Sequence, residues 1–413
     1  MSPTPKTTRE LLAHMEQSVM FTAARPPVVM ERGEGSYLWD VEGGRYLDFI
    51  QGWAVNCLGH SPPVIQKALA RQAAVLVNAS PAYYNPQWIE FAGLLTKTSG
   101  LDKVFFANTG AEANEGALKM ARKYGMRHLK GAYGVVTAWN SFHGRTLAMM
   151  SATGKGVWEG LFEPKVPGFT HVPFNDLEAM RLAVTNKVCA VMVEPVQGEG
   201  GVFPATVEYL RGLRKLCDET GVLLIFDEVQ TAIGRLGHLY GFQHYGVQPD
   251  IMTLGKGLGG GFPVSAVVAR EKACLFDIGE QGGTFNAQPL AMAVGKAVVE
   301  EVIHKNLCAH AARMGGRLMD KLKEMGREFG FADIRGMGLL VGVDLPQSEI
   351  PPGPAQPSAP TIGHQVVQEC LKAGLLINSP RPATLRFMPA LTVTETEIDE
   401  MVDILRGCLQ RVL

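Results

Sequence analysis

The chain has 413 residues, a formal net charge of −1, 19% charged residues and 46% hydrophobic residues. A charge this close to zero offers no electrostatic footprint for nucleic acid or an anionic membrane, so we expect neither partner. No apolar stretch reaches the length of a membrane span, and residues 1–17 show no secretory signal. The length exceeds one typical core, so we expect about two domains.

The cysteines and histidines indicate neither disulfides nor a metal site. Seven cysteines are scattered along the chain without a Cys-x-x-Cys motif, and the ten histidines show no metal-ligand spacing. An odd number of dispersed cysteines is typical of reduced thiols. The sequence therefore predicts a cytoplasmic protein without a bound metal.

The middle of the chain alternates between strand and helix patterns. Short apolar runs predict strands at 104–106, 134–138, 188–193, 222–226, 250–254 and 264–269, and helical patterns cover 113–129 and 207–219. Strands that alternate with helices indicate a mostly parallel, buried central sheet flanked by helices. We expect an α/β protein.

The last third of the chain has a different pattern. A long helical pattern at 290–304 leaves the large domain, and an apolar strand at 338–343 and a final helix at 395–412 follow. These elements predict a smaller α+β domain. Residues 346–360 are rich in proline and predict an exposed loop.

One lysine between glycines, Lys256, is the most informative position for function. The strand pattern 250–254 ends in Gly255-Lys256-Gly257, and the run 222–226 ends in Asp227-Glu228. If these runs are neighbouring strands, Asp227 and Lys256 emerge at the same edge of the sheet. Enzymes that use pyridoxal phosphate (PLP) require a lysine that binds the cofactor and an acidic partner for its ring nitrogen. The simpler alternatives are a surface lysine and a turn-forming aspartate.

The same glycines also match a dinucleotide-binding pattern, Gly-x-Gly-x-x-Gly, at 255–260. That pattern requires a following helix and an acidic residue about 20 positions later. Here another apolar run, 264–268, follows, and Asp277 and Glu280 are weak acidic candidates. We therefore keep nucleotide binding as the disfavoured alternative.

Two further segments follow predicted strands and suit a phosphorylated aromatic ring. Thr109 and Glu112 have capping-box spacing at the start of a helix, whose free N–H groups attract anions. Phe142, after the strand 134–138, can stack on a flat ring. An ordinary capped helix and a core phenylalanine are the alternatives.

Five segments together resemble the class III aminotransferases, which are fold-type I PLP enzymes. The segments, in the order of the family, are 108–115, 141–146, 194–201, 226–235 and 254–261. With 46–49 and 385–389, the resemblance runs from about residue 30 to the end. Within this class, 54–60 and 78–84 are most similar to acetylornithine aminotransferases. The resemblance implies a large PLP-binding domain at 51–290 and a small domain at 291–413, to which the N-terminal segment 1–50 contributes.

The resemblance also implies roles for the cofactor-binding residues. Lys256 binds PLP and moves the substrate's α-proton, and Asp227 holds the proton on the ring nitrogen. Backbone N–H groups of Gly110 and Ala111 bind the phosphate, Phe142 stacks on the ring, and Gln230 bonds on the side of its phenolic oxygen. Thr284 would reach the phosphate of a neighbouring subunit, which implies a homodimer with shared active sites.

Three residues are implied to bind substrate. Arg386 would bind the α-carboxylate of glutamate or 2-oxoglutarate, Arg145 the distal carboxylate, and Glu199 would neutralise Arg386 when the donor is an ω-amine. The implied reaction moves an ω-amino group, preferably from N2-acetyl-L-ornithine, to 2-oxoglutarate. It yields a semialdehyde and L-glutamate in arginine biosynthesis. The alternatives are donors such as 4-aminobutyrate, ornithine or another ω-amino acid, and a PLP-dependent mutase or racemase.

Overall fold

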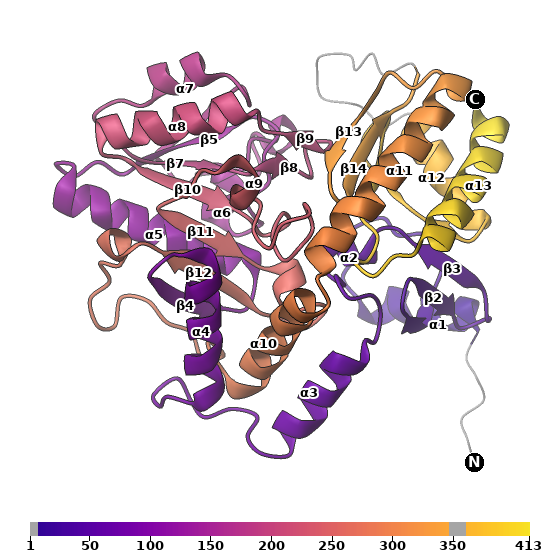
Figure 1. Cartoon of the computed structure of the whole chain (residues 1–413), viewed down its shortest axis with the longest axis horizontal. Coiled ribbons are helices and arrows are strands. Elements are labelled where there is room, and N and C mark those ends of the chain that lie inside the picture. Colours follow the sequence, from indigo (N-terminus) through magenta and orange to yellow (C-terminus); the bar gives the residue numbers. More distant parts are fainter. Residues whose placement is uncertain (1–6, 347–360) are drawn as a thin grey trace.

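The computed structural model describes residues 7–346 and 361–413. Its centre is a seven-stranded sheet in the order β4-β12-β11-β10-β7-β5-β6 (Figure 1). The strands are β4 Lys103–Ala107, β5 Gly134–Ala138, β6 Phe169–Val172, β7 Val188–Val193, β10 Leu223–Asp227, β11 Ile251–Leu254 and β12 Ser265–Ala269. The expected α/β class is confirmed. The expected Pro-rich loop, apart from residue 346, lies in the segment 347–360, which is outside the described residues.

One strand of the sheet, β12, runs against its neighbours. It pairs antiparallel with both β11 and β4, whereas β6, β5, β7, β10 and β11 pair in parallel. Only the short segment 255–264 connects β11 to β12, which is too short for the helical crossover that a parallel neighbour needs.

Helices cover both faces of the sheet, and the strands alternate between them (Figure 1). Leu224 and Phe226 of β10 pack in the cluster that includes α8 (Val207–Thr220), together with α7 (Leu177–Ala183). Leu223 and Ile225 pack in the cluster that includes α5 (Gly110–His128). Because successive side chains of a strand point to opposite faces, a continuous apolar run here means burial on both sides.

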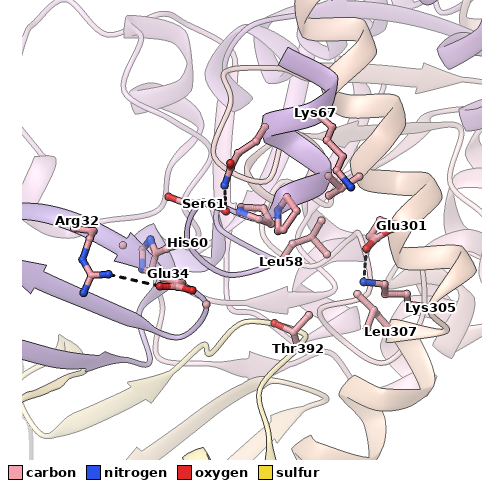
Figure 2. A pocket seen from close by; sticks show the side chains of 16 residues that line it. Arg32, Glu34, Leu58, His60, Ser61, Lys67, Glu301, Lys305, Leu307 and Thr392 are labelled. Atoms are coloured by element: carbon pink, nitrogen blue, oxygen red, sulfur yellow. Dashed lines mark hydrogen bonds and ion pairs between the residues drawn. The ribbon is translucent and has the colours of Figure 1, made fainter. Parts of the chain in front are cut away.

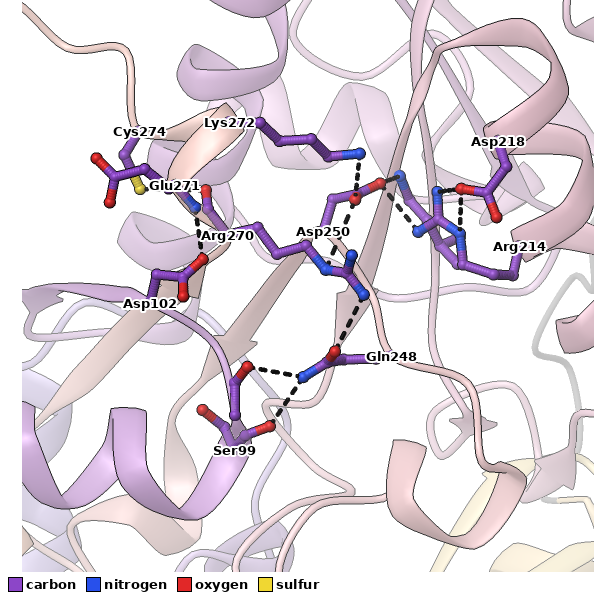
Figure 3. A network of polar contacts seen from close by, with 12 residues as sticks. Ser99, Asp102, Arg214, Asp218, Gln248, Asp250, Arg270, Glu271, Lys272 and Cys274 are labelled. Carbon is purple, nitrogen blue, oxygen red and sulfur yellow. Dashed lines mark hydrogen bonds and ion pairs between the residues drawn. The ribbon is translucent and has the colours of Figure 1, made fainter.

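The edge of the sheet where β11 begins is held by a buried carboxylate. Asp250 has no exposed surface, and its Oδ2 accepts from the Leu224 N–H at 2.8 Å and from Arg214 at 2.9 Å. Lys272 Nζ lies 2.6 Å from Oδ1, and Arg270 lies at 4.0 Å (Figure 3). Burial alone would raise the pKa of Asp250, but these donors and cations lower it below its usual value.

Two four-stranded sheets lie beside the central one (Figure 1), and β8 Val196–Gln197 pairs with β9 Phe203–Pro204 in a two-stranded sheet. One has the order β1-β2-β3-β15, with β1 Met30–Glu34, β2 Tyr37–Asp40, β3 Arg45–Asp48 and β15 Leu375–Leu376. The other has the order β13-β14-β17-β16, with β13 Asp333–Met337, β14 Leu340–Asp344, β16 Asn378–Arg381 and β17 Thr384–Phe387. The first sheet joins strands from the two ends of the chain. The domain boundaries at residues 50 and 290 stay a prediction.

The remaining helices connect and cover these sheets. They are α1 Thr8–Ser18, α2 Gln51–Ala54, α3 Pro63–Ala73, α4 Pro86–Ser99, α6 Leu147–Ala152, α9 Phe242–Tyr245, α10 Pro289–His304, α11 Leu307–Phe329, α12 Ile362–Lys372 and α13 Glu395–Val412. The expected helices at 290–304 and 395–412 thus agree with α10 and α13. None of the helices in the described ranges is long and apolar enough to cross a membrane.

Candidate active site

The carboxyl end of β10 meets the carboxyl end of β11 at one cavity. Asp227 pairs in register with Thr253, three residues before Lys256. The side chains of Asp227 and Lys256 line a cavity of about 510 Å³. The sequence prediction that Asp227 and Lys256 emerge at the same edge of the sheet agrees with this geometry. The dinucleotide pattern at 255–260 leads into strand β12 rather than a helix, as the sequence indicated.

Asp227 is buried and held by three donors. Its Oδ2 accepts from Asn114 Nδ2 and from His143 Nδ1, both at 2.8 Å. Its Oδ1 accepts from the Val229 N–H at 3.0 Å. Asn114 also donates to the His143 carbonyl at 2.7 Å, so α5 and the segment after β5 hold one carboxylate together. A carboxylate fixed in this way faces the cavity with a defined orientation.

Lys256 has the environment that a reactive amine needs. It follows Gly255 in a turn and has a φ of 44°, a region that side chains other than glycine rarely adopt. Burial lowers the pKa of Lys256 below its usual value, and the carboxylates of Glu199 and Asp227 oppose that shift. A lowered pKa increases the fraction of neutral amine, which is the form that attacks carbonyl carbon.

The start of α5 forms an anion cradle on the cavity wall. Thr109 caps the helix, and its hydroxyl accepts from the Glu112 N–H at 3.2 Å while Glu112 accepts from the Thr109 N–H at 2.7 Å. The N–H groups of Gly110 and Ala111 have no acceptor in the described chain and border the cavity. A side chain at position 110 would collide with Val229 at 2.7 Å, so Gly110 keeps this wall open. This donor set fits a phosphate group.

Phe142 and Glu194 line another part of the cavity. Phe142 borders the cavity, and its N–H donates to Glu194 Oε2 at 3.2 Å. Burial, with the nearby charge of Asp227, raises the pKa of Glu194 well above its usual value. Both influences favour the neutral form of Glu194 and so oppose a second negative charge beside Asp227.

A buried ion pair lies at the side of the cavity nearest β17. Arg386 has no exposed surface and donates to Glu199 Oε1 at 2.7 Å. Arg386 also lies 3.2 Å from Asn378 Oδ1 and 3.4 Å from Gln230 Oε1. The positive charges of Arg386, Lys256 and Lys155 outweigh burial and lower the pKa of Glu199 to about 2. Arg386 is a group that can bind a carboxylate, and the Glu199 carboxylate occupies it in place of a substrate carboxylate.

The last two predicted residues lie farther out. Arg145 is exposed at the cavity mouth, with its guanidinium 5.5 Å from the centre of the Trp158 ring. Thr284 is exposed in the segment before α10 and does not line this cavity. The structure thus brings Lys256, Asp227, Gln230 and Glu199 together but not Thr284.

Sequence reasoning did not assign roles to Asn114, His143 and Glu194. All three lie within the segments that resemble the family, at 108–115, 141–146 and 194–201, but their proximity to Asp227 bridges long stretches of chain. Asn114 and His143 are 113 and 84 residues from Asp227. The available signal was positional, since Asn114 lies one helical turn after Gly110 and faces the same cavity.

A second cavity, of about 610 Å³, lies between the N-terminal strands and α3 (Figure 2). Its charged side chains include Arg32, Glu34, Lys67 and the Glu301–Lys305 pair at 2.6 Å. None of the predicted site residues lines it. The first cavity is therefore the candidate active site.

A mostly parallel sheet whose strand ends present a lysine, a buried aspartate and a helix N-terminus to one cavity defines a fold-type I PLP-dependent transferase. The model of the family Aminotransferase class-III matches residues 20–409. The chain belongs to the class III aminotransferases and is a PLP-dependent enzyme.

Proteins of known name are similar to this one over nearly the whole chain. An acetylornithine aminotransferase of Ralstonia nicotianae is 48% identical over 95% of this chain and 97% of its own. The ornithine aminotransferase of Toxoplasma gondii, in a structure with partial occupancy of PLP at its active site, is 33% identical with a TM-score of 0.91, covering 99% of this chain and 95% of its own. The acetylornithine aminotransferase of Elizabethkingia anophelis is 32% identical with a TM-score of 0.85, covering 98% and 100%.

Proposed function

We propose that this enzyme transfers the terminal amino group of N2-acetyl-L-ornithine to 2-oxoglutarate, giving a semialdehyde and L-glutamate in arginine biosynthesis. The names of relatives that are 42–48% identical support this donor. The buried Arg386–Glu199 pair is the observation that carries the proposal, because it suits one pocket that serves both an ω-amine and an α-amino acid. When bound, PLP supplies an aromatic ring that accepts electrons from the substrate carbon.

Lys256 and Asp227 carry the chemistry in this proposal. Lys256, with its lowered pKa, would hold the cofactor; as a neutral amine it would accept the substrate proton, and as the resulting ammonium it would return that proton. Asp227 bonds the ring nitrogen and keeps it protonated. Its fixed orientation on Asn114 and His143 means that no reorganisation is needed as the reaction proceeds.

The remaining cofactor-binding residues have positioning roles. The free N–H groups of Gly110 and Ala111, at the positive end of α5, bind the phosphate. Phe142 would cover one face of the ring, and Gln230 would bond near its phenolic oxygen. These contacts hold the ring against Lys256.

Carboxylate recognition changes between the two half-reactions. With glutamate or 2-oxoglutarate, Arg386 binds the α-carboxylate in a bidentate pair and Arg145 binds the distal one. With the ω-amine donor, no carboxylate adjoins the reacting carbon, and Glu199 neutralises Arg386 instead. A side chain at Gly198 would overlap Gln230, and one at Gly200 would lie 2.7 Å from the Asn140 carbonyl. This close packing favours a rotation of the Glu199 side chain over a movement of the loop.

A variant tests this carboxylate switch. Glu199→Ala should slow the half-reaction with N2-acetyl-L-ornithine more than the half-reaction with glutamate, because Arg386 then lacks its internal partner. Stopped-flow measurement of cofactor absorbance reports each half-reaction separately. Equal slowing of both would make Glu199 a fixed structural partner.

We also propose that the enzyme is a homodimer with shared active sites. Large apolar side chains are exposed near Thr284 and in the segment before α4: Phe285 is 60% exposed, Tyr83 70% and Tyr84 81%. A second copy that covers them would bury this surface and bring Thr284 to the partner's phosphate site.

The donor is tested with 2-oxoglutarate and a panel of amines. We expect N2-acetyl-L-ornithine to give the highest kcat/KM, ahead of ornithine, 4-aminobutyrate and lysine. A higher value for one of the other amines would replace the proposed donor and keep the enzyme class. The scattered cysteines support a cytoplasmic location. Cell fractionation would test the location, and thiol labelling would test whether the cysteines are reduced.

A further inference from the structure

Rotation of Glu199 away from Arg386 raises a physical problem, namely where its charge goes. The pKa of Glu199 is about 2, so the side chain remains a carboxylate at neutral pH. A largely buried carboxylate that loses its charged partner is destabilised. A second cation near the Glu199 loop would offset that loss.

Three cations lower the pKa of Glu199: Arg386, Lys256 and Lys155. In the half-reaction with glutamate, Arg386 is occupied by the substrate's α-carboxylate. Lys256 is committed to the cofactor and to proton transfer, which requires the neutral amine. Lys155 is the cation that remains.

Lys155 is a half-buried lysine with an unused ammonium group. Its Nζ lies 5.1 Å from the centre of the Phe142 ring and 5.5 Å from that of Trp158. Within the described ranges, neither a hydrogen bond nor an ion pair links Lys155 Nζ to an acceptor. Burial lowers the pKa of Lys155, and Glu199 is the strongest influence that raises it. An ammonium held on two rings retains three donors for an incoming carboxylate.

The backbone brings the two residues together. The Asn140 N–H donates to the carbonyl of Gly154, the neighbour of Lys155, at 2.7 Å. The Asn140 carbonyl packs against Gly200, the neighbour of Glu199. Asn140 thus joins the segment of Lys155 to the loop of Glu199. Phe142 lines the active-site cavity together with Glu199, and the centre of its ring is 5.1 Å from Lys155 Nζ.

We propose that Lys155 is the second partner of Glu199, which receives its carboxylate when glutamate or 2-oxoglutarate occupies Arg386. This inference rests on the proposed switch of Glu199. Lys155 is then a positioning residue that acts through Glu199 and sets the specificity for α-carboxylate substrates. Lys155 stabilises the state in which Arg386 is free of Glu199 and can bind the substrate, without touching the substrate itself.

Stopped-flow measurement of the two half-reactions tests the proposal in three variants. These are Lys155→Met, Lys155→Arg, and the double variant that combines Lys155→Met with Glu199→Ala. Lys155→Met keeps the apolar stem and removes the charge, so we expect about tenfold weaker apparent binding of glutamate and 2-oxoglutarate. The half-reaction with N2-acetyl-L-ornithine should stay within about twofold of wild type. Tenfold corresponds to about 1.4 kcal/mol. Lys155→Arg keeps the charge and should behave as wild type.

The double variant distinguishes the possible outcomes. Without Glu199, removal of the Lys155 charge should have no further effect on glutamate binding. An equal loss in both backgrounds would make Lys155 a direct substrate contact and overturn the inference, even if Glu199→Ala behaves as the switch requires. Equal slowing of both half-reactions by Glu199→Ala alone would overturn the switch and this inference with it.

A matched control detects purely local damage. Lys165 Nζ donates to the Trp158 carbonyl at 2.8 Å, so Lys165→Met disturbs the same segment without removing the charge that acts on Glu199. We expect both half-reactions of Lys165→Met to change by the same factor. A selective loss of glutamate binding in Lys165→Met equal to that in Lys155→Met would assign the effect to packing and refute the role of Lys155.

Discussion

Asp227→Asn is the sharpest test of the proposed chemistry, because it changes charge with little change of shape. In the wild type, the Asp227 carboxylate accepts from Asn114, His143 and the Val229 N–H. An amide has one acceptor oxygen, so its NH₂ group must face at least one of these donors. We expect a loss of about 1–3 kcal/mol in the free energy of unfolding, which leaves the protein folded.

The effect on catalysis should be larger than the effect on folding. The amide lacks the negative charge that keeps the ring nitrogen protonated. Removal of one such preorganised electrostatic partner costs about 10²–10³-fold in rate, or roughly 3–4 kcal/mol. Because Asp227 faces the cofactor and not the substrate's carboxylate, both half-reactions should slow by the same factor.

Single-turnover kinetics with glutamate and with N2-acetyl-L-ornithine would measure this loss, and thermal unfolding and cofactor content would serve as folding controls. Asn114→Ala is the matched control, because it removes one donor to Asp227 and keeps the charge. That variant should lose only about tenfold. A rate within tenfold of wild type for a fully loaded Asp227→Asn enzyme would refute the pyridinium role.

Three further predictions concern the cofactor, the assembly and the sheet. Lys256→Ala should abolish turnover with every donor, and borohydride reduction of the wild type followed by peptide mapping should find the cofactor on Lys256; a label on another lysine contradicts the assignment. Sedimentation at assay concentration should show at least a dimer, and Thr284→Ala should weaken PLP binding; an active monomer would exclude the shared site. Asp250→Asn should lower the free energy of unfolding by about 3 kcal/mol at pH 7, since it leaves three cations around a neutral group. The lowered pKa of Asp250 means that its contribution is present above the unfolded-state pKa of about 3.9 and is lost as pH falls through the folded-state value. The stabilities of wild type and Asp250→Asn should therefore begin to converge as pH falls below about 3.9 and meet only below the folded-state pKa, and a constant gap would contradict the assignment.

The sequence predicted those parts of the fold and the site that depend on local pattern. The apolar runs before Asp227 and Lys256 correspond to β10 and β11, because a strand buried on both faces has no polar positions. Their order along the chain then placed both side chains at one edge. Strand β6, Phe169–Val172, was not predicted, since its sequence Phe-Thr-His-Val has no continuous apolar run.

Contacts between distant segments could not be predicted in the same way. Asn114 and His143 hold Asp227 across more than eighty residues, and no spacing rule connects them. The free ammonium of Lys155 is equally invisible to pattern, because a lysine beside a glycine normally indicates a surface turn. The role of Thr284 depends on a second chain and stays a prediction.

The pairing of β3 with β15 has a consequence for how the protein is made. Strand β3 ends at Asp48 and its partner β15 begins at Leu375, so the ribosome must add roughly 330 residues between them. At about 5–20 residues per second, the edge of β3 waits on the order of half a minute for its neighbour. An unpaired edge invites pairing with other chains, and charged side chains discourage it. Arg45 begins β3, and Glu31, Arg32 and Glu34 lie in β1 at the other edge of this sheet. Charged side chains at these positions disfavour pairing with another chain while the last strand is still to be synthesised.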